Sequence, residues 1–130
     1  MGGTEEVSFA AMQPGLDGGI MVTASHNPMD YNGMKLVRGG AIPISGDSGL
    51  RELETLVAAL GDVVPAGLAS MKAWELRPEY IKHLLSYVST RKLKPLRIVV
   101  NPGNGSAGLV INALESQLPF QFIKLQDTPD

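Results

Sequence analysis

The sequence predicts an α/β protein, in which short apolar strands alternate with amphipathic helices. Apolar runs that are typical of buried strands stand at residues 19–22, 96–100 and 120–125. Between them, apolar side chains recur every three or four residues over 48–60 and 78–89, which is the period of a helix with one buried face. Strands and helices that alternate along a chain favour a layered fold, with helices packed on the faces of a sheet.

The first forty residues are expected to contain three strands. The first covers residues 7–11, the second 19–22, and a short third 35–37. The second strand leads directly into the polar segment 23–33, so Ser25 is expected where a strand opens into a loop. Strand ends are where α/β proteins place their chemistry.

Two helices are expected in the middle of the chain. The first covers 48–60, where polar residues at 45–48 can cap its start and Gly61 can end it. Residues 62–73 are rich in Gly, Pro and Ala without a clear period, which predicts a loop. The second helix begins near Pro78, a suitable first-turn residue, and runs to about residue 89.

The last forty residues predict a strand, a glycine loop, a helix and a second strand. Gly103, Gly105 and Gly108 form a complete G-x-G-x-x-G between the strand 96–100 and the next helix, and Asp127 follows the final strand. This order is also the fingerprint of a dinucleotide-binding unit. The simpler interpretation is a close strand-to-helix turn, in which the glycines serve packing.

Composition and charge narrow the functional class. Eleven basic and thirteen acidic residues form no dense basic patch, so nucleic acid is not an expected partner. The chain has no cysteine, which excludes disulfides and thiolate metal sites. No apolar run reaches membrane-spanning length, and the N-terminus, with Glu5 and Glu6, does not read as a signal peptide. A cytoplasmic location is expected.

The most informative segment runs from Thr23 to Pro28 and continues through Asn32 and Gly33 to Lys35. It places Ser25 on a tight polar turn with His26 beside it and a lysine ten residues later. A phosphoserine carries about −1.5 to −2 charges and three strong acceptor oxygens, so it needs cations nearby. His26 and Lys35 are the nearest candidates.

This segment closely resembles the phosphoserine loop of the α-D-phosphohexomutases, the family of bacterial phosphomannomutases and phosphoglucomutases. The resemblance implies that Ser25 carries a phosphoryl group and passes it to a hexose phosphate, with Mg²⁺ bound through the serine phosphate. By the same resemblance, His26 and Lys35 contact the phosphate or assist proton transfer, and Asn27 helps to shape the loop. Asn27 and Asn32 are expected to bind the substrate or the phosphate. The product would enter carbohydrate metabolism through nucleotide-sugar synthesis.

The resemblance also implies an incomplete protein. The chain lacks the Asp-Gly-Asp-x-Asp-Arg loop that supplies the family's other Mg²⁺ ligands, and it lacks the sugar-reading Gly-Glu-x-Ser loop. Residues 1–92 are expected to be the later part of domain I, and 93–130 the start of domain II. The expected fold is therefore a set of incomplete three-layer α/β/α mixed-sheet domains. We expect this polypeptide alone to be an inactive part of a mutase, with phosphomannomutase as the parent activity.

Several alternatives stay open at this stage. Phosphoglucomutase and phosphoglucosamine mutase need the same serine, and the glycine loop keeps dinucleotide binding as a separate possibility. A non-catalytic fragment would expose apolar faces, which predicts a homodimer. A serine-hydrolase dyad is not expected, because Ser25 lacks the G-x-S-x-G context and an adjacent His26 in extended backbone would point away from it.

Overall fold

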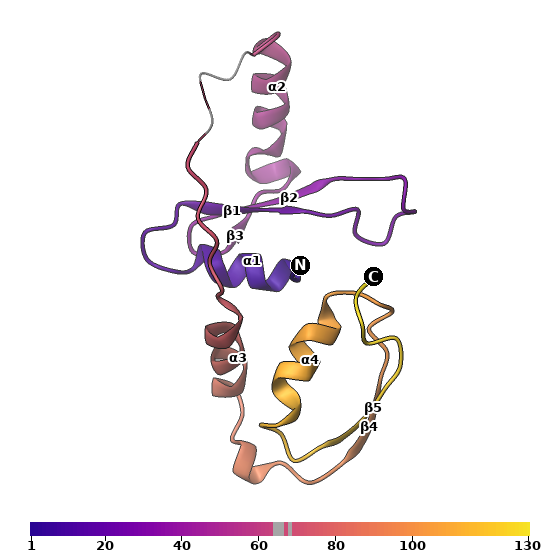
Figure 1. The fold of residues 1–130 in the computed structure, drawn as a ribbon. Helices are drawn as coiled ribbons and strands as arrows, with labels where there is room; N and C mark the ends of the chain where they lie inside the picture. The colour runs from indigo at the N-terminus through magenta and orange to yellow at the C-terminus, as the bar shows by residue number, and fades with distance from the viewer. Residues whose placement is uncertain (64–66, 68) are drawn as a thin grey trace. The chain divides into compact units, whose positions relative to one another are not determined.

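The computed structural model describes residues 1–63, 67 and 69–130. The chain forms two compact units, one of Met1–Glu6 with Glu75–Asp130 and the other of Val7–Trp74. Each unit is described by itself below (Figure 1). The boundary predicted near residue 93 divides domains I and II of the family that the chain resembles. It is a different division from these two units, and it remains a prediction. The expected loop over 62–73 includes residues 64–66 and 68, which lie outside the described residues.

The chain begins with a helix, α1 (Thr4–Ala11), so the strand predicted over 7–11 is wrong. Glu5 and Glu6 lie in the first helical turn, where the positive end of the helix dipole favours acidic side chains. Phe9 is buried together with the last residue of the helix. An apolar run of only five residues fits either period, and here the acidic residues before it indicate the helix.

A three-stranded antiparallel sheet follows, in the order β1 (Gly18–Val22), β2 (Met34–Arg38) and β3 (Ile42–Pro43). The strands predicted at 19–22 and 35–37 are confirmed. The sequence did not predict β3, because two residues are too few to show a period. The long connection between β1 and β2 carries the segment around Ser25.

Helix α1 covers one face of this sheet (Figure 1). Gly19 lies where the helix approaches most closely, and an added Cβ there would stand 2.7 Å from Val7 Cγ1. Val37, directly opposite Gly19 in the register, is buried on the same face. The Gly40 N–H donates to the Ala11 carbonyl at 2.8 Å, which fixes the end of the helix to the β2–β3 turn.

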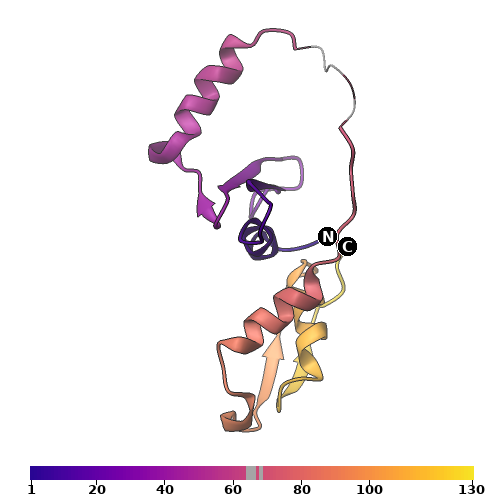
Figure 2. The ribbon, with the colours of Figure 1, turned by 90° about the vertical axis from the view of Figure 1, so that its left-hand side faces the viewer.

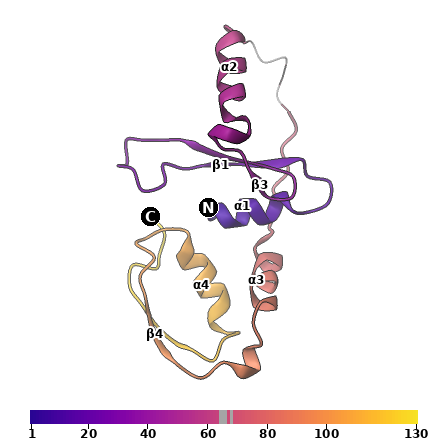
Figure 3. The same ribbon diagram turned by 180° about the vertical axis from the view of Figure 1, so that it is seen from behind.

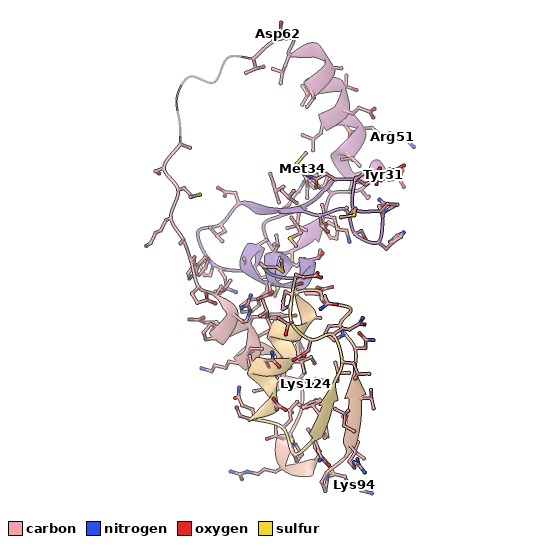
Figure 4. The ribbon with its side chains drawn as sticks, turned by 45° about the vertical axis from the view of Figure 1, so that its right-hand side comes forward. Tyr31, Met34, Arg51, Asp62, Lys94 and Lys124 are labelled. Carbon is pink, nitrogen blue, oxygen red and sulfur yellow. The ribbon has the colours of Figure 1, made fainter. Side chains whose placement is uncertain are left out.

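The other face of the sheet meets helix α2 (Arg51–Ala59), which is preceded by a wide turn over Gly46–Leu50. The predicted helix over 48–60 is confirmed in its main part. Figure 4 shows Met34 on the side of the sheet from which α2 rises. An apolar groove of about 620 Å³ separates the two elements, and it is lined by Met34, Leu36, Leu50, Leu53, Glu54, Val57 and Ala58. No residue of α2 is buried, so this face is only partly covered.

The other unit is built from α3 (Arg77–Ser86), β4 (Arg97–Val100), α4 (Ala107–Glu115) and β5 (Gln121–Lys124), with a short 3₁₀ turn over Thr90–Lys92. Strands β4 and β5 pair in parallel through the α4 crossover. Figure 2 shows the parallel strands beside α3 and α4, and Figure 3 shows α4 lying between α3 and β4. All four predicted elements are confirmed, although α3 ends before residue 89. One unit has an antiparallel sheet and the other a parallel pair of strands, each packed with helices, which confirms a mixed α/β fragment.

Two ion pairs hold elements of this unit together. Arg77 Nε lies 2.9 Å from Glu6 Oε1, and the same guanidinium donates to the Met1 carbonyl at 2.7 Å. Lys124 Nζ lies 2.8 Å from Glu115 Oε2, which connects β5 to the end of α4 (Figure 4). Across the described part of the chain, no helix has both the length and the apolar character needed to span a membrane.

Candidate active site

The candidate site is the loop of residues 23–33 between β1 and β2. The Thr23 N–H donates to the Gly33 carbonyl at 2.9 Å, which extends the strand pairing by one step and closes the base of the loop. The Asn32 side-chain oxygen accepts the Gly33 N–H at 2.9 Å. Asn32 therefore shapes the end of the loop, and its predicted role in binding the substrate or phosphate remains a prediction.

Two tight turns form the body of the loop. The Asn27 N–H donates to the Ala24 carbonyl at 3.1 Å, and the Tyr31 N–H donates to the Pro28 carbonyl at 3.0 Å. The side chains from Ser25 onward through the loop are exposed. Asn27 thus contributes to the loop through its backbone, and its side chain is presented to solvent.

Ser25 has a left-handed backbone with φ +56°. For a residue with a Cβ this conformation costs of the order of 1–2 kcal/mol, and such residues gather at functional sites. The Ser25 N–H donates to Thr23 Oγ1 at 3.0 Å. Sequence reasoning missed this contact. A threonine two residues before a turn residue is the pattern that could have indicated it, since hydroxyl groups often bond to the backbone two positions on.

The structure corrects the expected relation between Ser25 and His26. Ser25 Oγ lies 3.4 Å from His26 Nδ1, so the two side chains face each other. The expectation that they would point apart assumed extended backbone, in which neighbouring side chains alternate. The left-handed conformation of Ser25 removes that alternation and brings the serine oxygen within hydrogen-bonding reach of the imidazole.

Lys35 is not joined to this pair by any hydrogen bond or ion pair within the described residues. It is the second residue of β2, stands opposite Met21 in the register, and is exposed. Residues opposite each other in antiparallel strands share a face, so Lys35 lies on the same side of the sheet as Val37. Its predicted role at the phosphate remains a prediction.

The described residues do not fit a Mg²⁺ site by themselves. Mg²⁺ prefers several oxygen ligands in near-octahedral geometry. No group of three or more His, Asp or Glu side chains is placed to hold a metal in the part of the chain that the structure describes. Asp30 is an exposed carboxylate in the loop, and a phosphate on Ser25 would add one further source of oxygen ligands.

The glycine loop before α4 is occupied by bonds within the protein. The amides of Gly103, Asn104 and Gly105 donate to Asn101 Oδ1, the Gln126 carbonyl and the Pro102 carbonyl, at 2.9, 2.7 and 3.0 Å. A dinucleotide pyrophosphate is normally bound by free amides at such a loop. This geometry therefore favours the packing interpretation of the glycines over dinucleotide binding.

Gly108 shows the packing constraint directly. A Cβ added there would stand 2.0 Å from the Asp127 carbonyl oxygen, and Gly108 is buried. The third glycine of the motif is therefore required by the close approach of the segment that follows β5. Asp127 lies against α4 through its backbone, whereas the dinucleotide interpretation assigns a ligand contact to its side chain.

Comparison with known proteins identifies the family. Residues 1–63 match the family described as phosphoglucomutase/phosphomannomutase, alpha/beta/alpha domain I. The whole chain is 56% identical over 138 aligned residues to a phosphomannomutase of Salmonella montevideo, and 49% identical to one of Escherichia coli K12. It spans 30% of the length of each.

A solved structure agrees with these relatives. The crystal structure of a phosphoglucomutase/phosphomannomutase family protein from Burkholderia thailandensis matches with a TM-score of 0.75 and 31% sequence identity. The match covers all of this chain and 29% of that one. The chain therefore belongs to the α-D-phosphohexomutase family and is homologous to about 30% of a bacterial phosphomannomutase.

Proposed function

We propose that this chain is the phosphoserine-bearing part of a phosphomannomutase, an isomerase that interconverts mannose 6-phosphate and mannose 1-phosphate. The observation that carries the proposal is the 56% identity to a phosphomannomutase along the whole chain. The exposed, strained Ser25 near the base of a closed loop supports it, because a phosphoryl carrier must be held in place while it remains accessible.

In the proposed reaction Ser25 carries the phosphoryl group on Oγ. A substrate hydroxyl attacks the phosphorus, the bond from phosphorus to Ser25 Oγ breaks, and the proton of that hydroxyl passes to Ser25 Oγ, which leaves a hexose bisphosphate. In the second transfer, Ser25 Oγ attacks the other phosphate and gives up its proton as the new bond forms, while the bond from that phosphorus to the sugar oxygen breaks and the sugar oxygen takes up a proton. His26 Nδ1, 3.4 Å from Oγ, is the proposed acceptor of that proton.

The remaining loop residues act on charge and geometry in this proposal. Lys35 supplies positive charge near the phosphorylated loop, and Asn27 and Asn32 hold the loop in shape. Members of the family typically use Mg²⁺, which neutralises the charge of the transferred group. Its ligands other than the serine phosphate are proposed to lie outside this chain, so the 130 residues alone are expected to be inactive.

The domain assignment is part of the same proposal. We assign residues 1–92 to domain I and 93–130 to the beginning of domain II. The domain I match over residues 1–63 supports the first assignment, because it falls wholly within that range.

A chimeric enzyme tests the proposed function. The matching region of the Salmonella phosphomannomutase is replaced by this chain, and conversion of mannose 1-phosphate is measured with Mg²⁺ and a bisphosphate primer. We expect the chimera to be active and its Ser25→Ala variant to lose all measurable turnover. Ser116→Ala, at the exposed end of α4, is the matched control and should keep full activity. A folded but inactive chimera, or activity without the Ser25 hydroxyl, would contradict the proposal.

A second copy of this chain is the proposed partner of the isolated polypeptide, alongside the hexose phosphate substrate. The face of the sheet that α2 only partly covers exposes Ile20 by 60%, Val22 by 61% and Met34 by 65%. β1 is an edge strand without charged or proline residues, which leaves its outer backbone groups free to pair with another strand. An antiparallel β1 to β1 contact is self-complementary about a two-fold axis.

The exposed area of each copy is more than a contact of ordinary size needs. The chain exposes 10071 Å². Two separate compact units of this mass would together expose about 8,000 Å², so each copy has an excess of roughly 2,000 Å², compared with the about 800 Å² per partner that a standard interface buries. Light scattering at tens of micromolar should give twice the 13.8 kDa monomer mass. Ile20→Lys should give the monomer and Met71→Lys should not, whereas a monomeric wild-type chain would refute the dimer.

A further inference from the structure

We infer that Thr23 is a positioning residue for phosphoryl transfer, whose hydroxyl holds Ser25 in its left-handed conformation. The inference rests on the proposed function, in which Ser25 is the phosphoryl carrier. Its structural part can be tested without any enzymatic activity.

The conformation of Ser25 needs an interaction that offsets its strain. Serine at φ +56° is an uncommon state, because the Cβ crowds the backbone. Within the described residues the Ser25 amide has one hydrogen bond, from its N–H to Thr23 Oγ1 at 3.0 Å. That bond joins the serine to a residue two positions earlier and fixes the peptide plane between Ala24 and Ser25. From this fixed plane, the turn closed by the Asn27 N–H on the Ala24 carbonyl at 3.1 Å takes the Ser25 backbone to positive φ.

Thr23 is itself well anchored. Its N–H donates to the Gly33 carbonyl at 2.9 Å, directly after the Val22 to Met34 pair of the β1–β2 ladder. A β-branched side chain has few rotamers, so the position of Oγ1 follows closely from the backbone. Thr23 therefore connects the rigid end of the sheet to the serine that reacts.

The contact between Ser25 and His26 depends on this arrangement. Ser25 Oγ reaches to 3.4 Å from His26 Nδ1 only because Ser25 is turned out of the extended conformation. Without the Thr23 hydroxyl, the backbone at Ser25 is expected to relax to negative φ, and the two side chains then point to opposite sides. The proton acceptor would be lost from the serine oxygen while both residues remained present.

Two substitutions separate the hydroxyl from the rest of the side chain. Thr23→Val keeps the shape and removes the acceptor, and Thr23→Ser keeps the acceptor and removes the methyl group. In the chimeric enzyme, Thr23→Val should lower kcat about tenfold to 100-fold with little change in KM. Thr23→Ser should restore kcat to within about threefold of the unmodified chimera. Thr55→Val is the control, since the Thr55 hydroxyl is likewise bonded to the backbone, where it donates to the Arg51 carbonyl at 2.9 Å within α2.

Nuclear magnetic resonance of the 130-residue chain gives the readout that is independent of turnover. The three-bond coupling between the Ser25 amide and α protons, with the nuclear Overhauser effects around it, reports positive φ at Ser25. We expect this signature in the wild-type chain and in Thr23→Ser, and its loss in Thr23→Val. An inactive chimera would count against the proposed function, while the spectra would still decide the role of Thr23.

Two results would overturn the inference. One is a Thr23→Val chain that keeps positive φ at Ser25 together with a chimera whose kcat changes less than twofold. The other is a Thr23→Ser variant as impaired as Thr23→Val, because the hydroxyl would then not be the group that matters.

Discussion

Replacing Gly108 by alanine decides whether the third glycine of the G-x-G-x-x-G motif is needed for packing. Helix propensity alone predicts a gain, since alanine in place of glycine favours a helix by up to about 1 kcal/mol. The structure predicts the opposite, because the new Cβ would stand 2.0 Å from the Asp127 carbonyl oxygen and 2.9 Å from its carbon. Both are backbone atoms, which cannot move as a flexible side chain can.

The size of the effect follows from the movement that the new methyl group requires. Ordinary contact begins near 3.4 Å, so the two atoms must separate by about 1.4 Å. Hydrogen bonds on either side of Asp127 join Asn104 to the Gln126 and Thr128 carbonyls at 2.7 and 2.8 Å, and both would break. Two hydrogen bonds at about 1 kcal/mol each, plus an overpacking cost of about 1–3 kcal/mol, exceed the helical gain. We expect a net loss of about 2–4 kcal/mol.

Urea unfolding followed by circular dichroism measures this loss. Gly108→Ala should lower the unfolding midpoint by at least about 1 M. Gly103→Ala is the graded control: its Cβ would meet nothing within 4 Å, but its φ of +59° should cost about 1 kcal/mol. A Gly108→Ala midpoint at or above that of the wild-type chain would refute the packing argument and return this glycine to the ligand-binding interpretation.

Two further predictions concern pH. The hydrogen bond from Lys124 to Glu115 raises the pKa of Lys124 above its ordinary 10.5, so its stabilising contribution is complete below that value and is lost as pH rises through the raised pKa. The urea midpoint of unfolding should therefore decrease as pH rises above 10.5. Lys124→Gln should make this decrease smaller, whereas Lys94→Gln should leave it unchanged. Burial, and then the acidic first turn of α1, raise the pKa of Tyr80 above 10.0. The ionisation of Tyr80 is followed by ultraviolet absorbance, as the difference between the titrations of the wild-type chain and of Tyr80→Phe, and its midpoint should lie above pH 10.0. Glu5→Gln should lower that midpoint only partly, since burial is the larger cause.

Much of the fold was predictable because the apolar periods are strong where elements are long or well bounded. The strand 96–100 and the helix around Leu53 show their periods over a full element, and the structure has both. The failures fall on short segments. Residues 7–11 fit a strand as well as a helix, and β3 is two residues long, so long-range packing decides both.

The candidate site was predictable in its residues and only partly in its geometry. The string around Ser25 identified the loop and its family, because the residue types and spacing are specific. The bond from the Ser25 amide to Thr23 and the approach of His26 depend on one backbone angle. No residue type in the string predicts that angle at Ser25, since serine is not among the types that are enriched at positive φ.

Two residues of this chain, Asn104 and Ser25, have left-handed backbone for different reasons. Asn104, at φ +58°, is a residue type that tolerates this state, and its side chain and amide are both bonded to the segment after β5. Ser25, at φ +56°, is a type that seldom adopts it and lies exposed, and its amide donates to Thr23 Oγ1. Stability explains the first conformation. The second is explained if the loop must present the serine oxygen to His26 and to a substrate at once, which an extended serine at the same position would not do.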